Sequence, residues 1–208
     1  MGWPIERVDL GIVEYARAAV DMRGWVRERQ DGEAGDRLFL LGHPPVVTYG
    51  PRTDPADLPA DLPTVAVDRG GFATYHGPGQ LVGYLVVNVR ERGPVDIVRW
   101  LEQGLIDAMA ALGFAAIRRD TPNGSTSLAG VWTPDHRKIG SIGMRIRGGV
   151  TSHGFALNVD PDMAAFHHFT ACGLVDVTMT SLAELAAEQG VPTPTEPQVR
   201  DAVAAELC

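Results

Sequence analysis

Two stretches of the chain repeat apolar residues every three or four positions, which is the period of an amphipathic helix. The first is expected between about Gly11 and Arg29, and one of its faces carries Tyr15, Ala18, Ala19, Met22, Trp25 and Val26. The second follows Pro94, and one of its faces carries Ile97, Leu101, Leu105, Met109 and Leu112. Both stretches therefore predict helices that bury one side.

Shorter apolar runs have the length of β-strands. RLFLLG at 37–42 predicts a buried strand, and His43, Pro44 and Pro45 predict a turn after it. Similar runs predict strands at 64–67, 81–89, 114–118, 128–132, 138–146 and 150–159. Gly148 and Gly149 lie between the last two, as the turn of a hairpin would.

The last part of the chain carries helix signals of a different kind. Ser181 precedes LAELAAEQ as an expected N-cap, and Gly190 follows it as a stop. Thr195 and Gln198 have the spacing of a capping box for one more helix. Together with the strand-like runs, these helices predict an α/β (α+β) fold, with a mixed β-sheet flanked by helices in a single domain over 1–208.

Size and charge narrow the class of protein. The chain has 208 residues, enough for one domain with a sizeable core, and the three prolines of 54–63 indicate a surface loop rather than a linker. Its net charge of −8 argues against general nucleic-acid binding, which needs a basic face. No apolar run reaches the roughly 18 to 20 residues of a membrane span, and no signal peptide is visible. We therefore expect neither nucleic acid nor membrane as a partner.

Cysteine and lysine are both scarce. Cys172 and Cys208 are the only cysteines, which does not indicate a disulfide framework, so we expect a reducing, cytoplasmic compartment. Of 18 cationic side chains, Lys138 is the sole lysine and the others are arginines. Because an arginine does not deprotonate at working pH and a desolvated lysine can, Lys138 is where chemistry that needs a titratable amine is expected. The alternative is that Lys138 has no special role and is an incidental lysine in a composition biased toward arginine.

One glycine-rich segment, RGGFATYHGPGQ at 69–80, combines an arginine, a tyrosine and a histidine. Glycines after an arginine allow the backbone to approach a ligand closely. The segment has neither the GxGxxG nor the GKS/GKT pattern of nucleotide-binding loops. It predicts a binding loop, and a hairpin loop with exposed aromatic side chains is the alternative.

Two later segments carry further candidates. RKIGSIGMRIRGGVTSHGFALNV at 137–159 contains Lys138 at the start of one strand and His153 inside the next, where a histidine is more often structural than catalytic. FTACGLVDVTMTSL at 169–182 places Cys172 before Gly173, which permits a tight turn that presents a side chain. A lone cysteine is most often an inert buried residue. Cys172 is a candidate for catalysis because the sequence also contains a sole lysine and several histidines.

Metal and serine chemistry are both disfavoured. His167, His168 and Cys172 could supply two or three zinc ligands, but no CxxC or HExxH accompanies them and zinc sites usually need three or four. We expect no metal. GSTSLAG and GSIG lack the GxSxG elbow of serine hydrolases.

The motifs RGGFATYHGPGQLVGY, RKIGSIGMRI, TSHGFALNV and ACGL followed by TSL resemble those of the lipoyl (octanoyl) transferases, within the biotin and lipoate protein ligase superfamily. They run in the family's order and spacing from HPPVVTYG at 43–50 to TSL at 180–182. The resemblance implies a mixed-sheet α/β fold and no cofactor. It implies transfer of an octanoyl group from acyl carrier protein to a lysine of lipoyl domains, in oxoacid dehydrogenase acyltransferase subunits and the glycine cleavage H protein.

The resemblance also implies roles for individual residues. Cys172 matches the family's nucleophile and Lys138 its catalytic lysine. The family's acyl-binding stretches fall on Arg69, Gly70, Gly71, Phe72, Ala73, Thr74, Tyr75, His76, Ser141, Ile142, Gly143, Gly154, Phe155 and Ala156. Supporting roles are expected for His153, Gly77 and Gln80. Ala171 stands where the family commonly has proline, and Gly140 where it has a small residue such as alanine.

The residue types suit this chemistry. A free cysteine has a pKa of about 8.5 and is only a few per cent ionised near pH 7. An ammonium about 4 Å away contributes roughly 4 kcal/mol at an effective dielectric near 20, and about 1.36 kcal/mol shifts a pKa by one unit. Lys138 would thus favour the Cys172 thiolate, and after acylation it would lose that counter-ion and accept a proton from the incoming amine. We expect Gly140 and Gly143 to form the base of an apolar pocket for the acyl chain, with Ile142 and Phe155 lining its sides.

Three alternatives remain. An ATP-dependent lipoate or biotin protein ligase would keep the lysine and use an adenylate instead of a cysteine nucleophile. A Cys–His thioesterase would pass the acyl group to water. A non-catalytic acyl-binding protein would form no covalent adduct. Arg145 and Arg147 are candidates for docking acidic carrier domains, and ordinary solvated strand charge is the alternative.

Overall fold

The central strands are buried on both faces because apolar residues occupy both sides of the sheet. In β2 (Asp36–Gly42), Leu38 and Leu40 join one core cluster, while Phe39 and Leu41 join another on the opposite face. This follows from the two-residue repeat of a strand. The computed structural model describes residues 4–89, 93–167, 169, 173–174 and 177–208.

Six strands form the larger sheet, with the order β1-β2-β6-β9-β8-β7. Their bounds are Ile5–Ile12 for β1, Gln80–Val86 for β6, Val150–Asn158 for β9, Lys138–Arg147 for β8 and Gly130–Trp132 for β7. β1 and β2 are parallel and the other neighbours are antiparallel, so the sheet is mixed. The expected α/β fold with a mixed sheet is confirmed.

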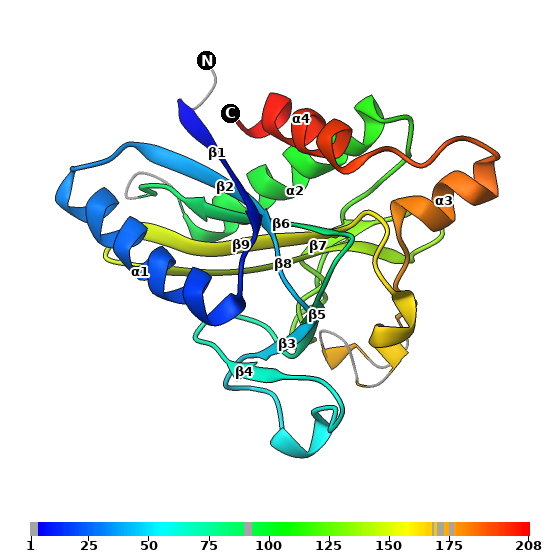
Figure 1. Ribbon diagram of the computed structural model, residues 1–208, viewed down its shortest axis with the longest axis horizontal. Helices are drawn as coiled ribbons and strands as arrows, with labels where there is room; N and C mark the ends of the chain where they lie inside the picture. The colour runs from blue at the N-terminus through cyan, green and yellow to red at the C-terminus, as the bar shows by residue number, and fades with distance from the viewer. Residues whose placement is uncertain (1–3, 90–92, 168, 170–172, 175–176) are drawn as a thin grey trace.

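A smaller sheet of three strands lies below the larger one in the view of Figure 1. β3 (Val46–Tyr49) is its middle strand, parallel to β4 (Thr64–Ala66) and antiparallel to β5 (Thr74–His76). A 3₁₀ turn, Pro55–Asp57, lies in the exposed proline-containing loop before β4. Another, Met163–His167, follows β9 and packs Ala165 and Phe166 against the small sheet.

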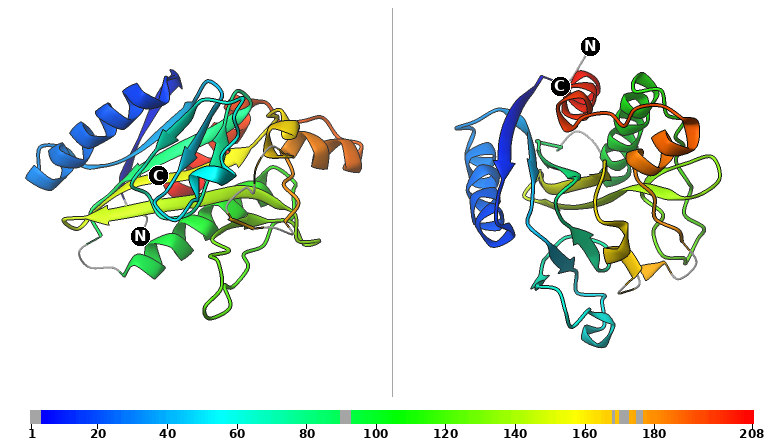
Figure 2. Two further views of the ribbon diagram at one scale, coloured as in Figure 1. Left: turned by 90° about the horizontal axis from the view of Figure 1, so that it is seen from below. Right: turned by 45° about the vertical axis from the view of Figure 1, so that its right-hand side comes forward.

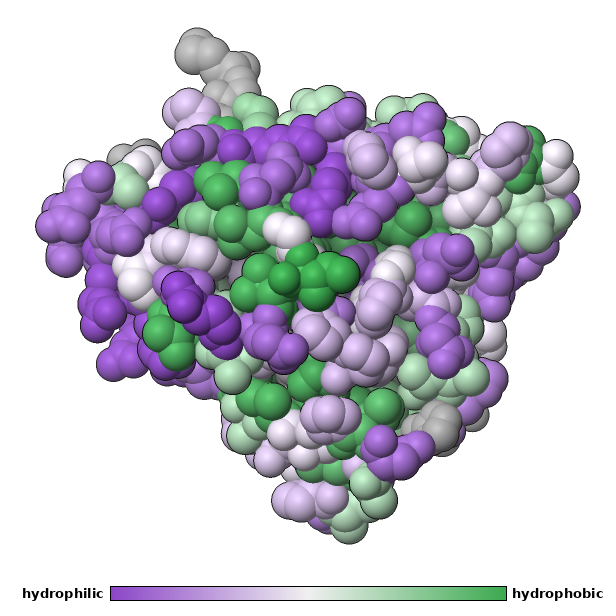
Figure 3. Space-filling model, in the orientation of Figure 1, coloured by the Kyte–Doolittle hydropathy of each residue, from purple (hydrophilic) through white to green (hydrophobic). Residues whose placement is uncertain are grey.

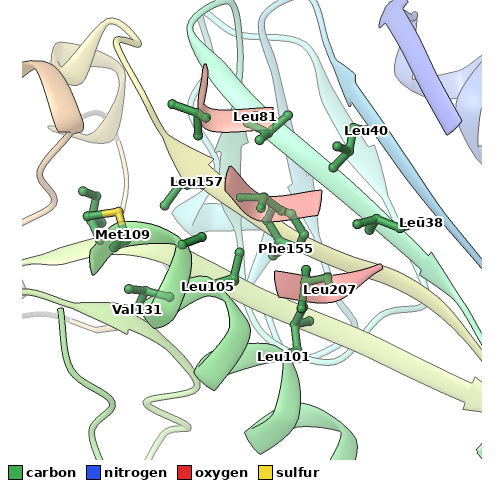
Figure 4. Close-up of a cluster of buried hydrophobic side chains, with 14 of the residues drawn as sticks. Leu38, Leu40, Leu81, Leu101, Leu105, Met109, Val131, Phe155, Leu157 and Leu207 are labelled. Carbon is green, nitrogen blue, oxygen red and sulfur yellow. The ribbon is translucent and has the colours of Figure 1, made fainter. Parts of the chain in front are cut away.

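Helices cover both faces of the larger sheet (Figures 1 and 2). α1 (Tyr15–Asp31) packs Ala18 and Met22 on one face. α2 (Pro94–Ala111) and α4 (Glu196–Leu207) pack on the other, where their side chains meet those of the central strands (Figure 4). α3 (Leu182–Gln189) extends the same cluster. In the part of the chain that the structure describes, no helix is long and apolar enough to cross a membrane.

The expected helix signals at the end of the chain are confirmed. The Ser181 side chain accepts a hydrogen bond from the backbone N–H of Glu184, and Gly190 ends α3 in the left-handed conformation. Thr195 and Gln198 form the capping box of α4.

Three expectations about the strands were wrong or incomplete. β1 extends to Ile12, so the first helix begins only at Tyr15 and not near Gly11. The segment 114–118 forms no strand and makes a single bridge from Ile117 to Trp132. β3 and β5 were not expected, because each is short and forms only by pairing with residues distant in the chain.

Candidate active site

The glycine-rich segment is held in place by its own arginine. The buried Arg69 guanidinium donates hydrogen bonds to the carbonyl and hydroxyl oxygens of Thr48 at 2.9 Å each. It also donates to the carbonyl oxygens of Gly70 and Phe72, at 3.0 and 2.9 Å. The Gly70 amide in turn donates to the Met144 carbonyl at 3.2 Å. Arg69 thus shapes a loop that closes over β8.

His76 follows this loop on β5 and is fixed in one neutral form. The Gln80 amide donates from Nε2 to Tyr75 O and Asn158 Oδ1, so its Oε1 is the acceptor for His76 Nδ1–H at 3.3 Å. His76 Nε2 then accepts from the Thr48 hydroxyl at 3.2 Å. Burial, with the nearby His43 and Arg69, holds the pKa of His76 well below its usual range. His76 is therefore an uncharged residue of the site.

A second histidine, His43, belongs to the same network of uncharged buried groups. His43 Nδ1–H donates to the Val13 carbonyl at 2.6 Å, so its Nε2 accepts from the Tyr84 hydroxyl at 2.7 Å. Burial lowers the pKa of His43. Burial also raises the pKa of Tyr15 to about 12 and that of Tyr84 well above its usual value. These groups supply hydroxyl and imidazole dipoles without net charge.

Lys138 begins β8 and is buried, which is rare for a lysine. Two hydrogen bonds hold its backbone in place. The amide donates to the Thr178 carbonyl at 2.8 Å, and the carbonyl accepts from the Thr180 amide at 2.9 Å. Its Nζ lies 5.2 Å from the ring centre of Trp132, the residue opposite it in the β7–β8 pair. A cation over an indole face is attracted by the ring, more strongly when water is excluded.

Gly130 provides the room that the Lys138 stem needs. A Cβ at Gly130 would lie 2.8 Å from Cε of Lys138 and 2.4 Å from the Gly140 carbonyl. The Gly130 amide donates at 3.0 Å to the buried carboxylate of Glu102, and burial raises the pKa of that carboxyl. The Arg119 guanidinium also lies over the Trp132 ring, 4.7 Å from its centre.

These elements enclose a cavity of about 230 Å³. Lys138 lines it, as do most of the expected acyl-binding residues: Arg69, Gly70, Gly71, Phe72, Thr74, His76, Ser141, Ile142, Gly143, Gly154, Phe155 and Ala156. His153 lines it too. The structure thus brings three segments that are distant in the sequence to one cavity.

Four expected site residues lie behind its wall. Ala73 and Tyr75 belong to the core of the small sheet, where Tyr75 meets Phe166 edge to face. Gln80 holds His76, and a Cβ at Gly77 would lie 2.0 Å from the Tyr75 hydroxyl. Gly140, expected as part of the acyl pocket, faces the core instead, where a Cβ would meet Val131 and Leu157.

Several residues of the cavity wall were not anticipated. Tyr15, Val82 and Tyr84 carry the apolar pattern of core residues, and only the packing of α1 on the sheet shows that they also face a cavity. The others carry no sequence signal that would have singled them out. They are Arg52, Val98, Thr126, Ser127, Ala129 and Met144.

His153 connects the cavity with the surface. It lies on β9 with a positive φ of 58°, and its Nε2–H donates to the Asp68 carboxylate at 3.2 Å. Burial lowers the pKa of His153 despite this carboxylate. For Asp68, partial burial opposes the effect, but the hydrogen bond from His153 and the charge of Arg145 lower its pKa overall. Arg145 pairs directly with Asp68.

Cys172, the expected nucleophile, lies outside the described residues, as do His168 and Ala171. Gly173, the next residue along the chain, is described and has a φ of 67°. A Cβ there would lie 2.7 Å from the ring of Phe72, so the backbone of Gly173 packs on a residue of the cavity wall. Glycine is therefore required at this position for both its conformation and its size.

The fold is that of the lipoate protein ligases. The structure of lipoate-protein ligase A bound with ATP superposes with a TM-score of 0.72 at 15% sequence identity, over 99% of this chain and 84% of that one. The chain belongs to the lipoyl protein ligase A/B catalytic domain family, whose model matches residues 16–208.

Curated relatives refine this assignment. An octanoyltransferase of Frankia casuarinae is 48% identical over 89% of this chain and 86% of its own. An octanoyltransferase of Mycobacterium sp. (strain KMS) is 45% identical over 99% of this chain and 84% of its own. The resemblance drawn from the motifs is confirmed.

Proposed function

We propose that this protein is an octanoyltransferase that moves an octanoyl group from acyl carrier protein to a lysine of a lipoyl domain, through a thioester on Cys172. The observation that carries the proposal is the buried side chain of Lys138 in the wall of an acyl-sized cavity. The contact of Gly173 with Phe72 supports a role for the adjoining cysteine at the same cavity. The relatives named octanoyltransferase support the choice of acyl group.

The cavity wall suits an alkyl chain and a thioester at once. Val82, Ile142, Phe155 and Ala156 provide apolar surface. Arg69 and Lys138 provide buried positive charge, while the burial of His76 keeps it neutral. Positive charge in the wall favours a thiolate and the oxyanion of a tetrahedral intermediate.

In the first half-reaction, the Cys172 thiolate attacks the thioester carbonyl of the donor. The tetrahedral intermediate collapses by breaking the bond to the donor sulfur, which leaves as a thiolate and takes up the proton of the Lys138 ammonium, so that Lys138 is left as a neutral amine. The acyl group is then joined to Cys172 as a new thioester. Lys138 acts here through its charge, because the thiolate and not the thiol is the nucleophile.

In the second half-reaction, the ε-amine of the acceptor lysine attacks this thioester. An amide bond forms, the C–S bond breaks and the Cys172 thiolate is released. Lys138, whose counter-ion disappeared when the cysteine was acylated, accepts the proton that the amine loses. One residue thus acts as a charge in the first step and as a base in the second.

The remaining features of the proposal concern the setting of the reaction. The acceptors are lipoyl domains of oxoacid dehydrogenase acyltransferase subunits and the glycine cleavage H protein. The chain acts as a single catalytic domain over 1–208, without metal or cofactor. Its scarce cysteines support a reducing cytoplasm as its compartment.

Transfer assays with two donors test the proposal. Octanoyl-acyl carrier protein alone should acylate a lipoyl domain, whereas octanoate with ATP and Mg²⁺ should not. The opposite pattern would identify an ATP-dependent ligase. This is the alternative function to test, because lipoate-protein ligase A shares this fold. Release of free octanoate without transfer would identify a thioesterase, and binding without turnover would leave only an acyl-binding protein.

A further inference from the structure

A second cavity of about 670 Å³ opens on the surface between α1, the segment 65–68 and the ends of β8 and β9. We call it the arginine groove, after Arg23, Arg27, Arg145 and Arg147 in its wall. Tyr15 and His153 line both this groove and the acyl cavity, so the two hollows share a wall.

In the described part of the chain, three of the four groove arginines lack an acidic partner, whereas several other surface arginines have one. Arg17 pairs with Asp21, Arg137 with Glu188 and Arg200 with Glu196. Among the residues that the structure describes, Arg23, Arg27 and Arg147 are exposed and make no ion pair.

Among the described residues that line the groove, Asp68 is the only acidic one, and it is already engaged by Arg145 and His153. In a chain of net charge −8, this leaves a local excess of positive charge that suits an anionic ligand. Hydrophilic side chains gather on the surface over α1 in the view of Figure 3.

The groove also has apolar lining. Ala19, Met22 and Val26 of α1 contribute to it, as do Val65 and Val67. The Gln30 side chain donates to the Arg147 carbonyl at 2.7 Å and ties the end of α1 to the β8–β9 turn. A ligand that fits both the arginines and the apolar lining has an anionic group and an uncharged, flexible stem.

We infer that the arginine groove binds the phosphodiester end of the donor's pantetheine arm, so that acyl carrier protein docks on this face and the arm reaches the acyl cavity past Tyr15 and His153. This inference rests on the proposed function. We assign the groove to the donor because a phosphodiester is an anion that arginines bind well, whereas the acceptor reaches the cavity with a lysine side chain, which carries no phosphate.

The dimensions agree with this assignment. Ser141 lines the acyl cavity, and Arg145 lines the groove four residues further along β8. At about 3.3 Å per residue these positions are roughly 13 Å apart. A pantetheine chain is about as long as four extended residues and spans roughly 14 Å. Phosphate in the groove and thioester in the cavity are therefore compatible.

The test compares two donors with the double variant Arg27→Gln/Arg147→Gln. With octanoyl-acyl carrier protein, kcat/KM for acylation should fall at least tenfold at low salt, and the difference from wild type should shrink as salt rises. With octanoyl-N-acetylcysteamine, which lacks both phosphate and protein, kcat/KM should stay within twofold of wild type. The KM for the lipoyl domain should not change.

Arg17→Gln is the matched control, because Arg17 is an exposed arginine of the same helix outside the groove. An unchanged rate with the carrier-bound donor would overturn the inference. So would an equal loss with the short thioester, or a loss confined to the lipoyl-domain KM, which would assign the groove to the acceptor. If the wild-type protein transfers from neither donor, the proposed function itself fails.

Discussion

At the scale of single residues, Trp132 and Gly130 are two neighbours that shape the surroundings of Lys138. Trp132 offers a ring face to the ammonium, and Gly130 leaves space for the stem. The composition alone singled out Lys138 as the sole lysine. It could not predict Trp132 as its partner, because the two residues face each other only through the β7–β8 register, which is irregular between Val131 and Trp132.

Replacing Lys138 separates the two roles proposed for it. Lys138→Arg keeps a permanent positive charge but cannot accept a proton. We expect it to retain part of the acylation of Cys172 and to lose transfer to the lipoyl domain. Lys138→Met keeps the stem without the charge and should lose both steps. Single-turnover mass spectrometry follows each step, and a wild-type transfer rate in Lys138→Arg would refute the base role.

Trp132 is expected to act as a positioning residue. A buried cation–π contact is worth about 2 kcal/mol, or roughly 30-fold in rate if lost during acylation. Trp132→Leu should therefore slow acylation by about that factor, while Trp132→Phe keeps a ring face and most of the rate. Thermal melts control for lost packing. Acylation of Trp132→Leu at the rate of Trp132→Phe would show that the ring does not assist Lys138.

At the scale of elements, the strands that the sequence predicted well are the inner strands of the larger sheet. β2, β6, β8 and β9 appeared as apolar runs because each contributes to a core cluster or the cavity. β1 was missed because charged residues interrupt its apolar positions, and its end merges with the start of the helical pattern at Ile12. β3 and β5 exist only by long-range pairing, which a single sequence does not display.

Close packing of β6 on β9 makes Gly154 sensitive to added volume. A Cβ there would lie 2.2 Å from the carbonyl oxygen of Gly83, and backbone cannot move aside as a side chain can. Gly154→Ala should destabilise the protein by about 3 kcal/mol. Gly11→Ala is the control, because no atom lies within 4 Å of its added Cβ, and it should change stability by less than about 0.5 kcal/mol. Urea unfolding measures both, and equal stabilities would contradict the packing.

At the scale of the whole molecule, three neutral histidines join the two sheets and α1. The His76 ring stacks on Tyr15, the His43 ring is tilted against it, and His153 lies edge to face with Tyr84. The motifs predicted that His76 and His153 matter, but not that they would be uncharged. That property comes from burial in the assembled fold and has no signature in the sequence.

Stability should therefore fall in mild acid. The unfolded chain protonates each imidazole near pH 6.5, whereas in the folded protein the pKa of His43, His76 and His153 is lowered. The unfolded state then binds more protons, so the unfolding free energy decreases as pH falls below about 6.5. Each histidine contributes up to about 1.4 kcal/mol per pH unit. Urea titrations from pH 7.5 to 5 measure this slope, which His43→Gln should reduce; a flat profile would contradict neutral burial.

Intact-mass measurement after incubation with octanoyl-acyl carrier protein tests the central claim most directly. The wild-type protein should gain one octanoyl group that thioester-cleaving hydroxylamine removes. The adduct should persist in Cys208→Ser, the matched control at the other cysteine of the chain, and be absent in Cys172→Ser. A protein that gains no mass while it modifies lipoyl domains, or an adduct that survives in Cys172→Ser, would contradict a Cys172 thioester.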